Sequence, residues 1–143
     1  MTSIPNNYYR TSIKALVLNE ENKFLLTKES DGRWELPGGG MDHGESPEAC
    51  LIREIKEEMG LTVIYFCKQP SYFYTDKHLK YEYVANVLFE VKLEHLNFTP
   101  SNECTEVRFF TKEEALKENL FPNVKVFLTV FDPNNHKVIK NIT

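Results

Sequence analysis

The sequence lacks any apolar run approaching the roughly 20 residues that a membrane-spanning helix needs. Residues 1–7 also lack the charged start and apolar stretch of a secretory signal. Basic residues are not in excess, because 17 Lys and Arg stand against 21 Asp and Glu, a net charge of −4. Nucleic-acid-binding proteins usually collect basic side chains on one surface. These absences favour a cytoplasmic protein that binds neither membranes nor nucleic acids.

Cysteine is also scarce. The three cysteines, Cys50, Cys67 and Cys104, are odd in number and far apart, which suggests neither a disulfide framework nor a zinc site. We therefore expect reduced thiols. The chain has no repeat or low-complexity linker, and its 143 residues, 41% of them hydrophobic, are enough to bury a core. We expect one globular domain over residues 1–143.

The order of the apolar segments predicts a mixed α/β domain. Residues 11–18 and 23–28 should form a hairpin, because a polar turn at 19–22 separates them. Other strands are expected where β-branched and aromatic residues gather, and helices where capping residues or proline precede an apolar periodicity. The further strands are expected at residues 61–67, 81–91 and 106–110, and the helices at residues 47–59, after a capping box at 111–114, and at 123–131.

Capping residues fix the ends of the helix expected at residues 47–59. Ser46 is a good N-cap, Pro47 suits the first helical position, and Gly60 can adopt the left-handed conformation that ends a helix. One face of this helix is apolar and should pack on the core. That face consists of Leu51, Ile52, Ile55 and Met59.

The neighbouring face is acidic, because Glu54, Glu57 and Glu58 fall within an arc of roughly 100°. Like charges at this spacing destabilise a helix, so a cation should lie opposite them. Carboxylate oxygens are preferred ligands of Mg²⁺ and Mn²⁺, which predicts a metal site. A solvated acidic face is the alternative for the three glutamates taken alone. Arg53 can bridge to Glu57 or reach back to Glu45.

A glycine-rich bend at residues 38–40 precedes the helix. Consecutive glycines let the backbone approach a ligand closely, so its carbonyl and amide groups can contact a metal or a phosphate. Five residues separate Gly39 from Glu45, and seven more lead to residues 53–61, which read Arg, Glu, aliphatic, any, Glu, Glu, any, Gly, aliphatic. Chance would produce these nine constrained positions with odds on the order of one in ten million.

This segment resembles the signature of the Nudix hydrolase family, of the MutT-like kind, and departs from it at no position. The matching residues are Gly39, Glu45, Arg53, Glu54, Ile55, Glu57, Glu58, Gly60 and Leu61. The resemblance implies the Nudix fold, a mixed β-sheet between α-helices. It also implies hydrolysis of a nucleoside diphosphate linked to another moiety. Family members are often dimers, so a homodimer is a form that the resemblance allows.

The resemblance further implies a set of site residues. Glu54, Glu57, Glu58 and the carbonyl group of Gly38 would hold Mg²⁺ or Mn²⁺. Such ions bridge diphosphate oxygens and lower the pKa of a water that attacks phosphorus in line. By the same resemblance, Glu45 and Arg53 hold the loop and the helix in register.

A general base is expected in addition to the metal ions. In family members it is often a glutamate outside or inside the signature. The candidates outside the signature here are Glu103 and Glu106, and the sequence does not choose between them. A place in a surface loop is the alternative for both residues.

Other residues are candidates for contact with the substrate. Gly39 and Gly40 could approach a phosphate through their backbone, and Lys28 could meet one with its ammonium group. Tyr72 belongs to an aromatic run that could form a wall for a nucleobase, and Asn123 could hydrogen-bond a base. The alternatives are an exposed lysine at a strand end, a core aromatic residue and the start of the last helix.

Two other residues near the signature have simpler expected roles. Trp34 is expected in the core rather than as a platform for stacking, because large aromatic side chains dominate packing. His43, in the loop inside the signature, is expected to be solvated.

Substrate choice stays open. Family subgroups that cleave ADP-ribose, dinucleoside polyphosphates or the reduced nicotinamide dinucleotide carry a proline or tyrosine downstream, and residues 76–79 contain neither. Nucleoside triphosphates, oxidised ones included, and sugar or alcohol diphosphates remain. An active diphosphatase is favoured because every acidic ligand is present. The alternatives are a nucleotide-binding module without catalysis and an isoprenoid diphosphate isomerase on the same scaffold.

Overall fold

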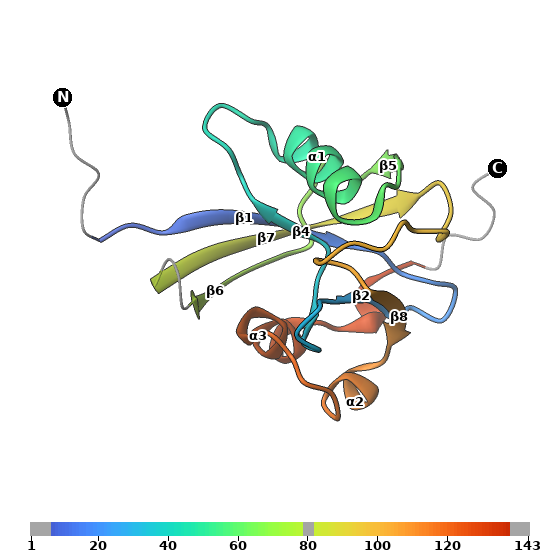
Figure 1. Ribbon diagram of the computed structural model, residues 1–143. Coiled ribbons are helices and arrows are strands. Elements are labelled where there is room, and N and C mark those ends of the chain that lie inside the picture. Colours follow the sequence, from blue (N-terminus) through green and yellow to red (C-terminus); the bar gives the residue numbers. More distant parts are fainter. Residues whose placement is uncertain (1–6, 79–81, 138–143) are drawn as a thin grey trace.

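The computed structural model describes residues 7–78 and 82–137, whose strands form two sheets (Figure 1). The larger, five-stranded sheet is mixed and has the order β4-β1-β7-β5, with β6 also paired to β7; the smaller, three-stranded sheet has the order β3-β2-β8. The strands are β1 Arg10–Leu16, β2 Phe24–Lys28, β3 Trp34–Glu35, β4 Gly38–Gly40, β5 Val63–Phe66, β6 Tyr72–His78, β7 Glu82–Leu93 and β8 Glu106–Phe110. The helices are α1 Pro47–Met59, α2 Lys112–Ala115, α3 Pro122–Val130 and the short 3₁₀ helix η1 Pro133–Asn135.

The larger sheet lies between two layers. Helix α1 covers one face, while α3 and the smaller sheet lie on the other (Figure 1). Side chains alternate along a strand, so β1 contributes to both cores. Ile13 and Ala15 pack with the apolar residues of α1, whereas Leu16 belongs to the same cluster as Trp34, Phe127 of α3, and Phe131 just after α3. The polar residues at even positions of β1 therefore point into the layer opposite α1.

Helix α1 confirms the expectation from its capping residues. It begins at Pro47 and ends at Met59, the Ser46 hydroxyl accepts a hydrogen bond from the backbone N–H of Ala49 at 3.1 Å, and Gly60 has φ 68°. Strand β8 has the expected bounds, and the capping box opens α2 as expected. The fold is thus a mixed α/β fold with sheets flanked by helices, as predicted.

Two expectations about packing are wrong. The strands at 11–18 and 23–28 do not form a hairpin, because β1 pairs with β4 and β7 while β2 pairs with β3 and β8. A single bridge between Leu18 and Phe24 links them before they diverge into different sheets. Ile52 is not in the core, since 47% of it is exposed; Cys50 is fully buried and takes its place beside the three other apolar residues of α1. Strands β3, β4 and β6 were not expected.

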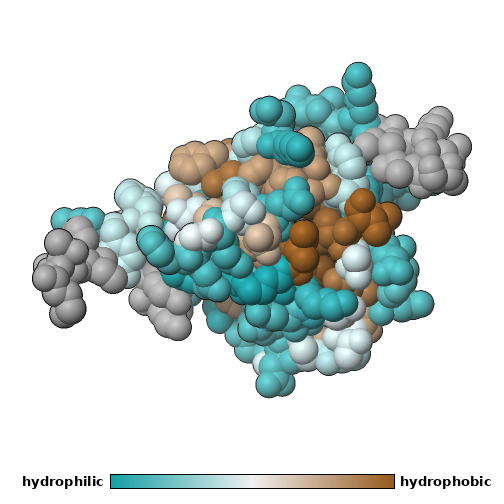
Figure 2. Space-filling view, turned by 90° about the horizontal axis from the view of Figure 1, so that it is seen from above, coloured by the Kyte–Doolittle hydropathy of each residue, from teal (hydrophilic) through white to brown (hydrophobic). Residues whose placement is uncertain are grey.

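The cysteines are free thiols, as expected. Burial raises the pKa of Cys50 to about 11 and that of Cys104 to about 12, so both thiols are poorly reactive. Within residues 7–78 and 82–137, no helix is long and apolar enough to cross a bilayer. The face seen from the α1 side is largely hydrophilic but carries an apolar patch (Figure 2). Ile52 of α1 and Ile64 of β5 are among the exposed apolar side chains.

Candidate functional site

Arg53 ties the loop before α1 to the helix. Its guanidinium donates two hydrogen bonds to the Glu45 carboxylate, from Nε at 2.7 Å and from Nη2 at 2.8 Å. It also donates from Nη1 to Glu54 at 2.9 Å and to Glu57 at 3.3 Å, and from Nη2 to the carbonyl oxygen of Gly40 at 3.2 Å. The two roles considered for Arg53 therefore occur together. These hydrogen bonds lower the pKa of Glu45 to about 2.

The environment of Glu58 shifts its pKa in the opposite direction to that of Glu45. Only 5% of it is exposed, and its carboxylate accepts a hydrogen bond from the Gly38 N–H at 2.9 Å. Burial raises the pKa of Glu58 well above its ordinary value, and burial also raises the pKa of Glu54. Glu54 lies so close to β4 that a Cβ atom at Gly39 would stand 2.7 Å from its carboxyl carbon. Glu54 and Glu58 of α1 thus lie directly against the glycine strand β4.

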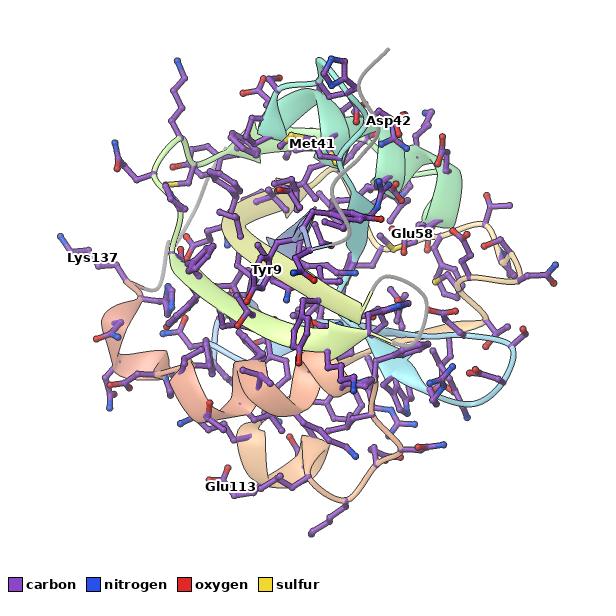
Figure 3. The ribbon with its side chains drawn as sticks, turned by 90° about the vertical axis from the view of Figure 1, so that its left-hand side faces the viewer. Tyr9, Met41, Asp42, Glu58, Glu113 and Lys137 are labelled. Carbon is purple, nitrogen blue, oxygen red and sulfur yellow. The ribbon has the colours of Figure 1, made fainter. Side chains whose placement is uncertain are left out.

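These residues line a cavity of about 310 Å³ between α1, β4 and the loops beyond. Figure 3 labels Asp42 and Glu58, two acidic residues that line this cavity. Two basic residues, Arg10 and Lys14, also line the cavity. Its acidic lining residues are Glu29, Glu35, Asp42, Glu54, Glu58 and Glu103.

Carboxylate oxygens are the ligands that hard divalent cations prefer, and six carboxylate side chains line this cavity together with the cationic side chains of Arg10 and Lys14. Burial, followed by the charges of Glu35 and Asp31, raises the pKa of Glu29 to about 7. In the described part of the chain, no three His, Cys, Asp or Glu side chains come close enough together to hold a metal ion. Glu54 is instead hydrogen-bonded to Arg53, so a cation would compete with Arg53 for this carboxylate.

Lys14 places a buried positive charge beside the acids. It is 6% exposed, and its Nζ donates to the carbonyl oxygens of Gly38 at 3.3 Å and Leu36 at 3.5 Å. The same ammonium group lies 3.7 Å from a carboxylate oxygen of Glu35. Lys14 and Glu35 also line a second, smaller cavity of about 150 Å³. The two cavities therefore adjoin.

Hydrogen bonds fix the polar side chains of the smaller cavity. The Asn86 amide donates to the Asp76 carboxylate at 2.6 Å and to the carbonyl oxygen of Tyr74 at 3.3 Å. The Asn123 amide donates to the Glu35 carboxylate and accepts from the Tyr74 hydroxyl at 3.2 Å. Strands β6 and β7 and helix α3 thus contribute polar groups to one cavity.

The structure brings some of the expected site residues together. The three glycines of β4 line the acidic cavity with Glu54, Glu58 and Glu103. Asn123 lines the smaller cavity, and it also lies in the first turn of α3. Trp34 is buried, as expected.

Other expected site residues lie outside both cavities. Glu57 is exposed beside Arg53. Glu106 is hydrogen-bonded to Arg108 at 2.9 Å and lies 3.9 Å from Lys28, so these charges pair with each other rather than with the acids of α1. Tyr72 packs against Phe127 of α3 and against Phe131 just after it, and its hydroxyl lies 2.7 Å from Nε2 of His136. The positions of these residues thus give no support to the expected role of Glu106 as a general base or to the expected contacts of Lys28 and Tyr72 with a substrate.

Several residues of the two cavities were missed from the sequence, namely Arg10, Lys14, Glu29, Glu35, Asp76 and Asn86. A signal existed for two of them. Lys14 and Asn86 interrupt strands whose neighbouring residues are apolar, and a buried polar residue requires a partner. Glu35, between Trp34 and Leu36, gives a weaker signal of the same kind, whereas Arg10, Glu29 and Asp76 have polar neighbours in the sequence and give none.

The model of the NUDIX domain family matches residues 8–131. An RNA pyrophosphohydrolase of Campylobacter jejuni is 31% identical over 142 residues, which cover 90% of this chain and 84% of that protein. A putative 8-oxo-dGTP diphosphatase of Bacillus subtilis is 40% identical over 76 residues, 50% of this chain. The crystal structure of a MutT protein from Methanosarcina mazei has a TM-score of 0.71 and 27% identity, covering 94% of this chain and all of that one.

The extent of these matches differs between relatives. The chain spans about half the length of the first curated relatives it matches, with 48% of one and 51% of the next covered. The family model nevertheless covers most of the chain, and it includes β4, α1 and both cavities. The chain belongs to the NUDIX domain family.

Proposed function

We propose that the protein is a divalent-metal-dependent hydrolase that cleaves the diphosphate bond of a nucleoside diphosphate linked to another moiety. The observation that carries this proposal is the acidic cavity, where the buried Glu58 faces a glycine strand and a buried lysine. Relatives named RNA pyrophosphohydrolase and 8-oxo-dGTP diphosphatase support it. Nudix hydrolases generally use divalent metals, and Mg²⁺ or Mn²⁺ is the cofactor proposed here.

Each residue of the acidic cavity has a proposed task. Glu54, Glu58 and the Gly38 carbonyl group would hold the ion, with Glu57 as a further ligand. The ion, when bound, supplies charge that neutralises the diphosphate and lowers the pKa of water. Lys14 donates to a diphosphate oxygen from the side opposite α1.

The proton of the attacking water needs an acceptor. Glu103 lines the acidic cavity, whereas Glu106 pairs with Arg108 outside it. We therefore assign the role of general base to Glu103. Glu45 and Arg53 have a structural task, because they hold the loop that follows β4 against α1.

A phosphate-release screen tests the function. Nucleoside triphosphates, sugar nucleotides and alcohol diphosphates are offered with magnesium and with manganese to the wild type and to Glu58→Gln. We expect release from at least one substrate class and a loss of roughly two orders of magnitude or more in the variant. Glu113→Gln, a change at an exposed residue of α2, is the matched control and should keep full turnover. Equal release by all three proteins would reject the proposal.

The alternatives predict different outcomes of the same screen. A binding module would take up nucleotide without releasing phosphate, and an isomerase would convert an isoprenoid diphosphate without cleaving it. The homodimer and the cytoplasmic location stay predictions; light scattering of the purified protein and fractionation of cells would check them.

A further inference from the structure

The smaller cavity is lined by polar groups that are buried as deeply as core residues. Asn86 is 1% exposed, Asn123 and Lys14 are 6% exposed, and Asp76 is 8% exposed. Polar side chains buried to this degree usually serve only to satisfy one another. Here they line open space of about 150 Å³ that adjoins the acidic cavity. A group attached to a diphosphate in the acidic cavity can therefore reach them.

Asn86 determines what Asp76 can bind. The Asn86 amide donates to the Tyr74 carbonyl oxygen and to the Asp76 carboxylate, so Asn86 presents Asp76 as an acceptor of hydrogen bonds. Carboxylate oxygens accept hydrogen bonds, and the two oxygens of one carboxylate suit a pair of parallel N–H donors. Glu35 adds a second carboxylate to the same cavity. The ligand that complements this lining carries adjacent N–H groups.

The cavity also contains a donor. The Lys14 ammonium group is already directed to the carbonyl oxygens of Leu36 and Gly38 and lies beside Glu35. One N–H of the Asn123 amide is directed to Glu35, and the other has no hydrogen-bond partner among the residues that the structure describes, so it can donate to a carbonyl oxygen on the ligand. The lining as a whole therefore fits a ring that has two adjacent N–H donors next to a carbonyl group.

We propose that the smaller cavity binds the base of the nucleotide and that Asp76 selects guanine by accepting hydrogen bonds from its N1–H and 2-amino groups. This inference rests on the proposed function, since it assumes that the diphosphate lies in the acidic cavity. Among the common bases, guanine alone presents an imino and an amino donor side by side. Adenine turns the lone pair of N1 toward the carboxylate. Uracil places two carbonyl oxygens beside its single N–H.

Calorimetric titration with nucleoside monophosphates, with magnesium present, tests the inference without relying on hydrolysis. We expect guanosine monophosphate to bind at least about tenfold more tightly than the adenosine and uridine monophosphates. Inosine monophosphate, which lacks the 2-amino group, should lose about tenfold relative to guanosine monophosphate. This comparison needs no variant, so it holds even if a substitution disturbs the fold.

Asp76→Asn tests the residue itself. The variant keeps the shape of the side chain but adds an N–H in place of an acceptor, so the preference for guanosine over uridine monophosphate should fall by about tenfold or more. Asp31→Asn changes an exposed aspartate outside both cavities and should keep the preference. Equal binding of all four monophosphates by the wild type, or an unchanged preference in Asp76→Asn, would overturn the inference.

The two proposals fail in different ways. Phosphate release without any base preference would reject the role of Asp76 and leave the hydrolase in place. A preference for guanosine monophosphate without phosphate release from any substrate would reject the hydrolase and leave a guanine-binding cavity.

Discussion

Glu45 and Glu58 belong to one loop–helix segment, yet their surroundings differ in kind. Glu45 accepts two hydrogen bonds from Arg53, which lower its pKa to about 2. Glu58 is buried under β4, where burial raises its pKa. The Glu45 carboxylate is compensated by the guanidinium of Arg53, whereas the Glu58 carboxylate is buried where a negative charge is unfavourable. Acids with raised pKa values occur preferentially at functional sites, which agrees with the role proposed for Glu58, whereas Glu45 is paired in the manner of a structural residue.

The largest effect should separate two neighbouring glutamates of α1. Glu58→Gln removes a buried carboxylate of the cavity, and we expect turnover to fall by roughly two orders of magnitude or more. Glu57→Gln changes an exposed residue that pairs with Arg53 and lies outside the acidic cavity, so it should cost only about tenfold. Steady-state kinetics of both variants measures the difference. A larger loss in Glu57→Gln than in Glu58→Gln would break the contrast between exposed and buried acids.

Removing the paired cation should act on stability. Arg53→Met removes the guanidinium that donates to Glu45 and Glu54 and leaves Glu45 with the Asp42 N–H alone, and we expect the free energy of unfolding to fall by roughly 1–2 kcal/mol after solvent screening. Urea denaturation measures this change. Arg108→Met is the control, since Arg108 pairs with Glu106 and Glu118 at the surface and its loss should cost less. Equal losses would show that the Arg53 network is no more than a surface pair.

A smaller effect should appear in the dependence of stability on pH. The pKa of Glu29 is raised from 4.5 to about 7, so between these values the folded protein binds more protons than the unfolded chain. The metal-free protein should therefore lose stability as pH rises from about 4.5 to about 7, by about 1 kcal/mol or less after screening. Thermal unfolding at several pH values checks this, and Glu29→Gln should flatten the slope. An unchanged slope in Glu29→Gln would contradict it.

Glu45 should act in the opposite direction. Its pKa is lowered from 4.5 to about 2, so its contribution to stability is complete above about pH 4.5 and is lost as pH falls toward 2. Glu45→Gln should reduce this loss on acidification, and it should leave the slope between pH 4.5 and 7 unchanged. Steeper acid unfolding in Glu45→Gln than in the wild type would be the contrary result.

The parts that the sequence predicted well are local. Ser46, Gly60 and the apolar spacing of α1 lie within one helix and its caps, so the helix could be placed to the residue. The partners of β1 and β2 were not predictable in this way, because each of these strands pairs with at least one strand from far along the chain, β7 for β1 and β8 for β2. β1 pairs with residues 84–90, for example, although the turn to β2 is much closer in sequence.

The candidate site also has a local part that was predictable and a long-range part that was not. Glu54, Glu58 and the glycine bend could be recognised because they stand within one short segment. The smaller cavity could not, because its contacts join residues 24 apart, as between Lys14 and Gly38, or 49 apart, as between Tyr74 and Asn123. Only the assembled sheet and α3 place these groups around one space.

Strand β4 has a consequence for how such a protein can diversify. Gly38, with φ 122°, packs so closely on β1 that a Cβ atom there would collide with the Ile13 carbonyl oxygen, and Gly39 leaves room for Glu54. The backbone of Gly39 and Gly40, together with Lys14 and Glu35, lines both cavities, whereas residues of β6, β7 and α3 line the smaller cavity alone. Under the two proposals above, substitutions on β6, β7 or α3 would therefore change which molecule is accepted and leave the acids of α1 in place.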